Sequence, residues 1–389
     1  MTRLAFIVSH PIQYVAPLYQ RLAKRGDLSI KVFFTWHAGE APVIDRGFGT
    51  AVKWDIPLTD GYDFELVENT AAEPGTHHFL GLRNPGLVQQ VKAWGPTAVH
   101  ITGWAWLSHL QAILAFSRSG IPVVFRGDSH LLDRGGALSW AKRSLLRWLY
   151  SYVTAFLVVG TANRQYYRAF GVPEARLFPC PYGIDVGRFA EPNERLERAA
   201  QEWRAELALP ETDLALIYAG KFERKKRPVE LMRAIQKLDN PSLRLIMLGS
   251  GELNDEVKTI AAADPQRFRV LPFQNQSRMP LVYRLGDVFV LPSAYGETWG
   301  LAVNEAMACG RPVLVSNKVG CAADLVKCGT GWVFDSDDPK SLLRTLRTVV
   351  AKKETLADMG NRNRQSARLF DFERAEDALL SCLNRIEAL

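Results

Sequence analysis

Short apolar runs alternate with longer amphipathic stretches along most of the chain. Each run is rich in aliphatic side chains and has the length of a single buried strand, whereas helical spacing of apolar residues is typical of the stretches between them. The runs in the first half are Leu4–Val8, Ile30–Phe34, Ala98–Thr102, Val123–Arg126 and Ala155–Val159, and those in the second half are Ala215–Tyr218, Arg244–Leu248, Phe268–Leu271, Val288–Leu291 and Val313–Val315. This alternation predicts parallel strands in a doubly wound α/β fold.

A charged passage separates the two sets of strands. It runs from Ala190 to Thr212, and Pro192 and Pro210 break the chain on either side of a short predicted helix. The length of 389 residues also exceeds what one hydrophobic core usually supports. We therefore expect two domains with a boundary near residue 190.

Two glutamates, Glu297 and Glu305, flank the start of a predicted small-residue helix that follows the apolar run at 288–291. A glycine turn before a helix leaves backbone N–H groups open to a phosphate. At about 1.5 Å per residue, Glu305 lies roughly 7 Å along a helix that begins near Gly300. This suits a sugar nucleotide, with its ribose beside Glu305 and its sugar beside Glu297. The alternative is two solvated carboxylates, of which only Glu297 is explained by attraction to a helix N-terminus.

The segment Pro292–Gly310 resembles the signature of the family 4 glycosyltransferases, which are retaining enzymes with two facing Rossmann-like domains, the GT-B fold. Upstream, Phe178–Asp185 with Phe189 resembles the family's crossing between domains. Tyr218–Pro228 resembles its strand, basic pair and helix start. The resemblance covers Phe178–Asp338 well and is vague over the N-terminal half. It therefore implies a GT-B protein and defines the donor-binding half better than the acceptor-binding half.

Two further segments compare differently with the family. Val319–Val326 has one glycine and Asp324 where the family has two glycines and a glutamate, so we assign this loop no role. Phe370–Glu373, followed by a helical pattern through Leu383, resembles the last helix of the family, which returns to the N-terminal domain. The resemblance thus implies an acceptor-binding domain of residues 1–189 plus about 371–389, and a donor-binding domain of residues 190–370.

The resemblance also implies roles for single residues. Lys221 and Lys226 match the basic pair that holds the donor diphosphate, and two cations stabilise the charge that builds on a departing phosphate. Lys221 stands where the family more often has arginine, and lysine lacks arginine's bidentate fork. The alternative is that this run is a solvated basic turn. The implied catalytic residues are Glu297, Lys226, Lys221 and His130, and the implied donor-binding residues are Glu305, Gly220, Trp299, Gly300 and Leu301.

Loops after strands of the first half supply acceptor candidates. His10 follows the first strand and could orient the acceptor or act as an acid–base, although a loop histidine that caps the next helix fits equally. Arg126 and Asp128 follow another strand, and Asp128 either accepts the acceptor's proton or caps a helix. His130 lies roughly where the family places a histidine beside the donor sugar. A third group, His100 with Trp104 and Trp106, suits sugar stacking or the core.

No metal site is expected from the sequence. The one Asp-x-Asp motif, Asp335–Asp337, precedes Asp338-Pro339 and reads as a turn and helix cap. The five cysteines are odd in number and have no Cys-x-x-Cys spacing, so neither disulfides nor zinc is favoured. The first apolar stretch, Leu4–Val8, is too short for a signal peptide, and no run reaches a membrane span. These features favour a cytoplasmic protein.

The formal charge of +7 favours anionic partners without choosing among nucleotide, lipid phosphate and nucleic acid, and no nucleic-acid-binding motif accompanies it. In residues 139–150, aromatic and aliphatic side chains interleave with Lys142, Arg143 and Arg147. Such a helix either lies in an anionic membrane interface or packs on the next strand with its cations in water. Peripheral contact with the inner face of a membrane is therefore one option.

Together these features predict a retaining, metal-independent glycosyltransferase without a cofactor. It would move a hexose-type sugar from a UDP- or GDP-linked donor to the hydroxyl of a glycan, a lipid-linked or a small-molecule acceptor, in surface polysaccharide or lipid-linked glycan synthesis. One alternative keeps the fold but catalyses sugar-nucleotide epimerisation or phosphorolysis, for which no acid–base pair or pyridoxal lysine is marked. Another is a non-catalytic module that binds nucleotide sugars or a membrane surface.

Overall fold

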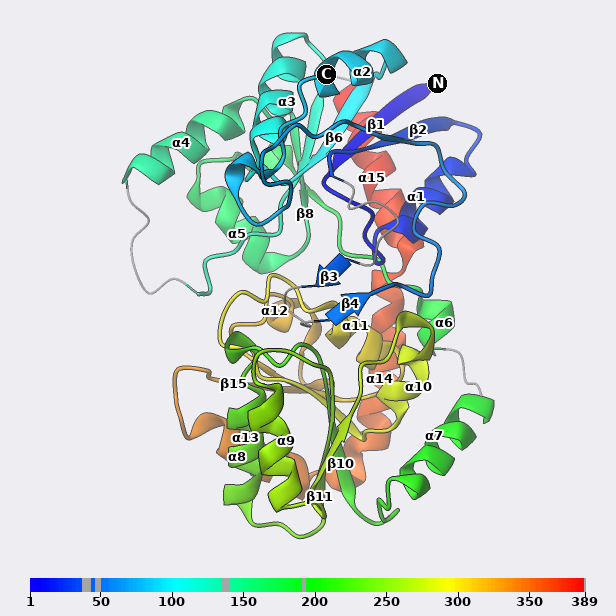
Figure 1. The fold of residues 1–389 in the computed structure, drawn as a ribbon, viewed down its shortest axis with the longest axis vertical. Helices are drawn as coiled ribbons and strands as arrows, with labels where there is room; N and C mark the ends of the chain where they lie inside the picture. The colour runs from blue at the N-terminus through cyan, green and yellow to red at the C-terminus, as the bar shows by residue number, and fades with distance from the viewer. Residues whose placement is uncertain (37–42, 46–49, 134–139, 191–193, 388–389) are drawn as a thin grey trace. The chain divides into compact units, whose positions relative to one another are not determined.

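The computed structural model describes residues 1–36, 43–45, 50–133, 140–190 and 194–387, without the side chains of residues 43–45 and 50–52. The chain forms two compact units (Figure 1). Unit 1 comprises Met1–Ala41, Ile56–Gly183 and Phe372–Leu389, and unit 2 comprises Pro42–Asp55 and Ile184–Asp371. Both units are therefore assembled from segments that are separate in the sequence.

Unit 1 contains a parallel sheet of seven strands in the order β5-β2-β1-β6-β7-β8-β9. The chain leaves β1 toward one edge and β6 toward the other, so the strand order switches between β1 and β6. The strands are β1 (Thr2–Val8), β2 (Leu28–Phe34), β5 (Phe64–Leu66), β6 (Ala98–Thr102), β7 (Val123–Arg126), β8 (Ala155–Val158) and β9 (Leu177–Pro179).

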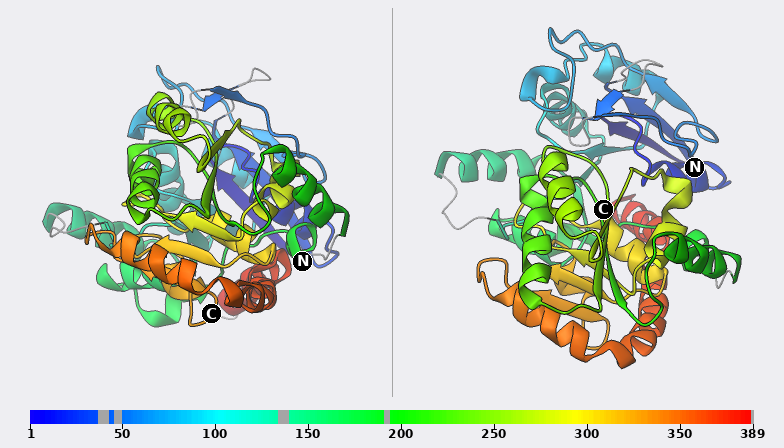
Figure 2. Two further views of the ribbon diagram at one scale, coloured as in Figure 1. Left: turned by 90° about the horizontal axis from the view of Figure 1, so that it is seen from below. Right: turned by 60° about the horizontal axis from the view of Figure 1, so that its bottom comes forward.

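Helices cover both faces of this sheet (Figures 1 and 2). Alternate side chains of β1 enter different cores, because successive residues of a strand point to opposite faces. Leu4 and Phe6 join the core under α1 (Ala16–Ala23) and α15 (Phe372–Glu387), whereas Ala5 and Ile7 join the core under the other helices. These are α2 (Leu87–Trp94), α3 (Leu107–Arg118), α4 (Trp140–Ser151) and α5 (Thr161–Ala169).

Unit 2 contains a parallel sheet of six strands in the order β12-β11-β10-β13-β14-β15. Here the strand order switches between β10 and β13. The strands are β10 (Leu214–Ala219), β11 (Leu243–Leu248), β12 (Phe268–Leu271), β13 (Val288–Leu291), β14 (Val313–Ser316) and β15 (Gly331–Phe334). The short strands β3 (Val43–Asp45) and β4 (Thr50–Val52) form a separate antiparallel pair.

The helices of unit 2 begin with α6 (Val186–Ala190) and α7 (Glu194–Glu206). The buried sides of α8 and α13 pack on the sheet in one apolar core with β10, β11 and β13, and α8, α9 and α13 lie side by side in Figure 1. The remaining helices are α8 (Pro228–Leu238), α9 (Asn254–Ala263), α10 (Met279–Arg284), α11 (Leu301–Ala308), α12 (Ala322–Leu325), α13 (Ser341–Ala351) and α14 (Leu356–Ala367), and 3₁₀ turns lie at 79–81, 174–176, 224–226, 276–278, 353–355 and 368–370.

The predicted α/β fold with parallel strands is confirmed. Every strand expected from an apolar run is present within a residue or two of its predicted ends, and the predicted helices at 300, 139–150 and 371–383 correspond to α11, α4 and α15. The sequence missed the edge strands β5, β9 and β15, which carry fewer buried side chains, and the short pair β3 and β4. Asp335–Asp337 forms the expected turn, but the expected cap is wrong, because α13 begins at Ser341 without a side-chain cap.

Candidate functional site

The candidate donor site of unit 2 lies where the carboxyl ends of β10 and β13 meet. These strands are neighbours at the switch in strand order, the place where ligands of open α/β sheets usually bind. Gly220 and Lys221 follow β10, and the loop that carries Glu297 follows β13. The topology thus brings together two motifs that are distant in the sequence.

Lys226 and Glu297 form an ion pair across these two loops. Lys226 Nζ donates to Glu297 Oε2, and the hydroxyl of Ser293 donates to the same oxygen at 3.2 Å. Both charged side chains are mostly buried, with 19% and 14% of their surface exposed. The pair therefore balances its own charge in a partly desolvated position.

Backbone contacts fix the Glu297 loop on two sides. Ala294 N–H donates to the carbonyl of Lys225 at 2.7 Å, which joins the loops after β13 and β10. On the other side, Gly320 N–H donates to the carbonyl of Glu297 at 3.0 Å. A Cβ at Gly320 would lie 1.9 Å from the carbonyl oxygen of Thr298, so only glycine allows this approach. The segment 319–326, to which the sequence assigned no role, thus supports the Glu297 loop.

The N-terminus of α11 begins at a left-handed glycine. Gly300 has φ +97°, and a Cβ there would meet Val319 at 3.0 Å and Leu291 at 3.1 Å. The first N–H groups of a helix have no partner within the helix, and the helix dipole adds positive potential. Gly300 and Leu301 lie at this terminus, as the sequence predicted. The terminus can accept an anion beside Glu297.

Glu305 lies within α11 and is paired with a tyrosine that the sequence did not indicate. Tyr283 Oη donates to Glu305 Oε2 at 2.7 Å. Burial raises the pKa of the Glu305 carboxyl, while the hydrogen bond from Tyr283 and the charge of Arg188 oppose this rise. One carboxyl oxygen is thereby fixed. Among the described residues, none donates a hydrogen bond to Oε1.

Arg188 is a further cation of this region that the sequence did not single out. It follows the predicted interdomain crossing and lies in the short helix α6. Arg188 Nη2 donates to Gln276 at 3.4 Å, and its buried Nε has no hydrogen-bond partner among the described residues. Its position next to Phe189, which the family resemblance included, was the available signal.

Three other predicted residues, Trp299, Gly220 and Lys221, take part in packing and in backbone contacts near the candidate donor site. The Trp299 side chain is buried, and its indole N–H donates to Asn304 Oδ1 at 2.9 Å, so its ring belongs to the core. The carbonyl of Gly220 lies 1.9 Å from where a Cβ on Gly249 would be, so glycine at position 249 is what allows the chain after β11 to approach Gly220. The carbonyl of Lys221 accepts a hydrogen bond from Tyr218 at 2.7 Å, which fixes the backbone of the basic loop.

The candidate acceptor residues of unit 1 also gather at a switch in strand order. His10 follows β1, and Arg126 and Asp128 end or follow β7, two strands away in the sheet. All three line a cavity of about 80 Å³ with mostly apolar walls. Arg126 Nε and Asp128 Oδ1 are 3.9 Å apart, and neither atom has a hydrogen-bond partner among the described residues. The sequence thus named three residues that the fold brings to one cavity.

Tyrosines shape the polar end of this cavity. The Arg126 guanidinium lies over the ring of Tyr182 at 4.2 Å, and Tyr182 Oη donates to Asp128 Oδ2. Burial and the charge of Asp128 raise the pKa of Tyr14 to about 12. Burial lowers the pKa of His10, whose Nδ1 lies 2.9 Å from Ser9 Oγ. The cavity therefore holds the buried Arg126 guanidinium and the Asp128 side chain beside the rings of Tyr14, Tyr182 and His10.

His130 and the third predicted group have structural contacts. His130 is buried, and its Nδ1 accepts a hydrogen bond from the N–H of Leu132 at 3.2 Å. Asn163 holds the loop before His130, because its Nδ2 donates to the carbonyls of Gly127 and Ser129. His100 also lines the cavity, and burial lowers its pKa to about 3. Trp104 packs against the apolar core, and the indole of Trp106 donates to the carbonyl of Thr76.

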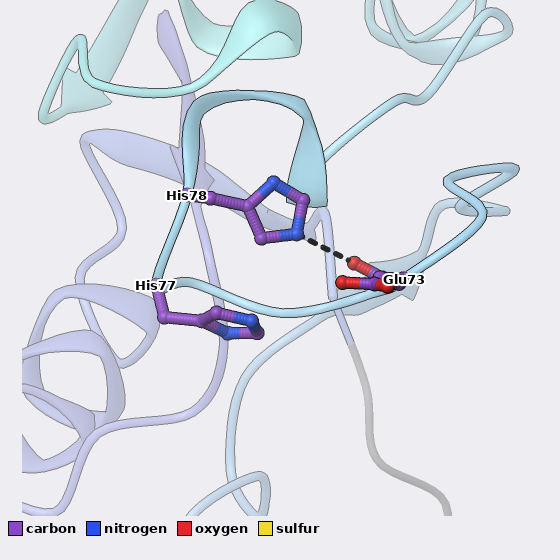
Figure 3. A group of neighbouring side chains, drawn as sticks. All are labelled: Glu73, His77 and His78. Atoms are coloured by element: carbon purple, nitrogen blue, oxygen red, sulfur yellow. Dashed lines mark hydrogen bonds between the residues drawn. The ribbon is translucent and has the colours of Figure 1, made fainter.

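One group of potential metal ligands occurs among the described residues. Glu73, His77 and His78 of unit 1 place ligand atoms within 4.8 Å of one another (Figure 3). His78 Nε2 also lies 3.0 Å from the carbonyl oxygen of Glu73. The arrangement makes these three side chains candidate ligands for a metal ion.

Comparison with known proteins identifies the family. Residues 11–183 match the model of the glycosyl transferase 4-like domain, and residues 199–366 match that of the glycosyl transferases of group 1. A D-inositol 3-phosphate glycosyltransferase of Streptomyces avermitilis is 31% identical over 403 residues, which cover 94% of this chain and 80% of the relative. The chain belongs to the group 1 glycosyltransferases.

Other similarities agree with this family. A D-inositol 3-phosphate glycosyltransferase of Rhodococcus opacus is 27% identical over 374 residues, which cover 88% of this chain and 80% of the relative. Anabaena HepE, solved with UDP and glucose, superposes with a TM-score of 0.73 at 15% identity and covers 99% and 100% of the two chains. Sucrose-phosphate synthase of Thermosynechococcus elongatus superposes with a TM-score of 0.72 at 18% identity over 100% of both chains. These solved structures show that the fold is of the GT-B type.

Proposed function

We propose that this glycosyltransferase is retaining and metal-independent and moves a hexose-type sugar from a nucleoside diphosphate carrier to an acceptor hydroxyl. The observation that carries the proposal is the partly buried Lys226–Glu297 ion pair beside the N-terminus of α11. A cation, a carboxylate and a helix N-terminus at one switch in strand order suit a ligand with a diphosphate and a sugar.

In this proposal the diphosphate replaces Glu297 as the partner of Lys226. Lys226 and Lys221 then stabilise the negative charge that builds on the phosphate as the sugar–oxygen bond breaks. Glu297, released from Lys226, accepts hydrogen bonds from sugar hydroxyls. The phosphates approach the backbone at two places, Trp299–Leu301 and Gly220. At Gly220 and Gly300 no side chain separates the backbone from the phosphates.

Glu305 holds the ribose in this proposal. Tyr283 fixes one carboxyl oxygen, and the other remains available as an acceptor for a ribose hydroxyl. The raised pKa of Glu305 reflects burial without a full ion pair, and two hydroxyl donors from a ribose would favour the ionised carboxylate. We infer a UDP-linked donor in preference to a GDP-linked one, because HepE, which has the same fold, was solved with UDP and with UDP-glucose.

The acceptor binds in the unit 1 cavity in this proposal. Arg126 Nε and Asp128 Oδ1, which have no hydrogen-bond partner among the described residues, offer a donor and an acceptor, the pair that a hydroxyl requires. His10 and His130 are the other polar side chains to which this proposal gives a part in the reaction. Relatives that use inositol 3-phosphate are 25–31% identical, which supports a polyol acceptor; a growing surface glycan or a lipid-linked one fits the same chemistry. The cytoplasm, where nucleotide sugars are made, is the proposed location.

Thermal unfolding with a panel of nucleoside diphosphates and their sugars, in EDTA, tests the donor assignment. A ligand that binds only the native state raises the unfolding temperature by mass action. A shift with one base names the donor class and supports binding without metal. No shift with any nucleotide would contradict the proposal. The double variant H77A/H78A removes the potential metal ligands and serves as a control for effects of EDTA elsewhere.

Retention needs a separate measurement. With a labelled nucleotide sugar and an acceptor that supports turnover, proton NMR of the first product gives the anomeric configuration before any mutarotation. The same α configuration in donor and product supports retention, whereas inversion overturns that part of the proposal. Release of free sugar phosphate, or an epimerised nucleotide sugar without transfer, would instead favour a phosphorylase or an epimerase.

A further inference from the structure

Helix α4 carries apolar side chains on two different faces. Leu146, Leu149 and Tyr150 are buried in the core of unit 1, next to Phe156 of β8. This confirms that one face packs on the neighbouring strand. Trp140, Leu145 and Trp148 are exposed by 82%, 47% and 42%, so they lie outside that core.

The exposed apolar residues share one stripe. At 100° per residue, Trp140, Trp148 and Leu145 fall within about 140° of the helix circumference, opposite the three buried residues. Ala141 and Ser144 lie in the same sector and leave the stripe without a charge. Figures 1 and 2 show α4 at the margin of unit 1, where its outer side is not covered by another helix.

Cations border this stripe. Arg147 and Arg143 lie about 20° and 60° beyond its Trp140 edge, whereas Lys142 falls in the sector of the buried residues; all three are exposed. The sequence of α4 contains no acidic residue. Among the residues that the structure describes, no carboxylate lies within ion-pair distance of Arg143 or Arg147. The outer surface of α4 is therefore apolar in the middle and positive along one border.

We propose that the outer surface of α4, defined by Trp140, Leu145, Trp148, Arg143 and Arg147, docks on an anionic phospholipid membrane. Tryptophans favour the headgroup level because their rings are apolar and their N–H is polar. Arg143 and Arg147 beside the stripe attract lipid phosphates. The apolar side chains of the stripe insert at the boundary between the headgroups and the acyl chains. A nucleic acid would use the cations but would leave Leu145 and the outer edge of Trp140 in water.

The surface differs from that of α7, another exposed helix of the protein. Helix α7 is charged along most of its length, but it alternates glutamates with arginines, and its Glu197 pairs with Arg284 and Arg311. Such a helix neutralises itself and offers no apolar stripe. Helix α4 has both features that interfacial binding needs, exposed tryptophans and two arginines, Arg143 and Arg147, for which the described part of the chain supplies no carboxylate within ion-pair distance.

Co-sedimentation with vesicles tests the proposal on the full chain. We expect the protein to partition at least tenfold more strongly on vesicles of phosphatidylglycerol and phosphatidylcholine than on phosphatidylcholine alone. Raising the salt from 0.1 to 1 M shortens the screening length from about 10 to about 3 Å and should reduce partition strongly. No partition above the neutral vesicles would overturn the proposal, and so would binding to single-stranded RNA without binding to vesicles.

Two variants separate charge from apolar contact. R143A/R147A should weaken partition at least tenfold, because each cation near an anionic surface contributes about fivefold. W140S/L145S should weaken it by a similar factor while leaving both cations in place. Urea unfolding midpoints equal to the parent's establish that the variants fold, which the exposure of Trp140 favours.

Control variants remove side chains of similar kinds at other exposed positions. K258A/K352A removes two cations from unit 2, and L80S removes an apolar side chain that is 58% exposed in unit 1. Both should partition within twofold of the parent. If the control variants weaken binding as much as the α4 variants do, the membrane contact is not specific to α4 and the proposal fails. The readout is independent of sugar transfer, so failure of the proposed reaction leaves it intact.

Discussion

The two units use the same architecture to place residues of different kinds at their sheet edges. In unit 2 the candidate site is held by consecutive backbone contacts, from Lys225 to Ala294 and from Glu297 to Gly320. In unit 1 the candidate cavity is formed by side chains from several strands, two helices and the chain after β9. A site fixed by backbone loops leaves a recognisable local motif in the sequence, whereas a site made of scattered side chains does not.

The units also differ in their titratable groups. The six histidines that the structure describes lie in unit 1, and burial lowers the pKa of His100 and His109 to about 3 and about 4. Unit 2 contains no histidine, and its buried Glu305 has a raised pKa. Acidification should therefore act on the two units in opposite directions.

The largest effect is expected from Lys226. K226A removes the cation that pairs with Glu297, and loss of one stabilising group at a developing charge typically lowers kcat by about 10²–10³-fold. Lys237, which is exposed on α8, provides the control K237A with unchanged kcat. Steady-state kinetics with saturating donor measure both. Near-parental turnover of K226A would remove Lys226 from the mechanism.

The second-largest effect on activity is expected from a substitution that shifts the backbone, G320A. In G320A the new Cβ lies 1.9 Å from the carbonyl oxygen of Thr298 in the parent geometry, so the support of the Glu297 loop must shift. We expect kcat/KM to fall about 10- to 100-fold, since small misplacements of reacting groups are costly. In G26A the added methyl meets no atom within 4 Å, and activity should be unchanged. Equal activity of G320A and the parent would show that this loop does not support the site.

Glu305 should affect donor binding more than turnover. E305A removes a carboxylate that would accept ribose hydroxyls, and a hydrogen bond to a charged group contributes about 1.5–3 kcal/mol. Donor Kd, measured by calorimetry, should rise about 10- to 100-fold. Y283F removes only the hydrogen bond that fixes Oε2 and should raise Kd less. Unchanged affinity in E305A would refute the ribose assignment.

A substitution in the acceptor cavity should affect the acceptor and not the donor. D128N keeps the shape of the side chain that accepts the hydrogen bond of Tyr182 but removes its charge. We expect the acceptor KM to rise about tenfold, while the shift in unfolding temperature caused by the nucleotide stays as in the parent. If D128N instead lowers nucleotide binding and leaves the acceptor KM unchanged, the assignment of the cavity to the acceptor is wrong.

The last prediction concerns the dependence of stability on pH. The folded pKa values of His100 and His109 are lowered, so their contribution to stability is fully present above pH 6.5 and falls with acidification, by about 1.4 kcal/mol per pH unit for each histidine. The folded pKa of Glu305 is raised, so its contribution is present below pH 4.5 and is lost as pH rises through the folded pKa.

Hydrogen exchange, followed peptide by peptide at pH 7 and pH 5, measures this difference. Peptides of β6 and α3, which carry the two histidines, should lose protection at pH 5 relative to peptides of β13 and α11 in unit 2. H109Q removes one titrating group while Gln keeps polar contacts to Thr35 and Thr102, and it should reduce the loss. Equal loss of protection in both units would contradict the prediction.

Local sequence determined the elements and most of the donor site. The apolar runs predict the central strands because a strand buried on both faces must be apolar at nearly every position, and the glycines mark the start of α11 because few other residues accept a positive φ. Lys226, Glu297 and Glu305 were identified from these signals and from the family resemblance. The residues that the sequence did not identify, Tyr283, Arg188 and Ser293, act on the site through neighbouring side chains and belong to no motif of their own.

Only the tertiary structure decided which distant residues meet. Parallel strands can be ordered in several ways, and the order β10-β13-β14 is what puts Lys226, Glu297 and Gly320 in contact. The same holds for the cavity lined by His10, Arg126 and Asp128, whose walls come from opposite ends of the chain. The sequence alone also cannot show that α4 has an apolar side left over after its core face is packed, because hydrophobic periodicity does not tell which apolar residues the core will cover.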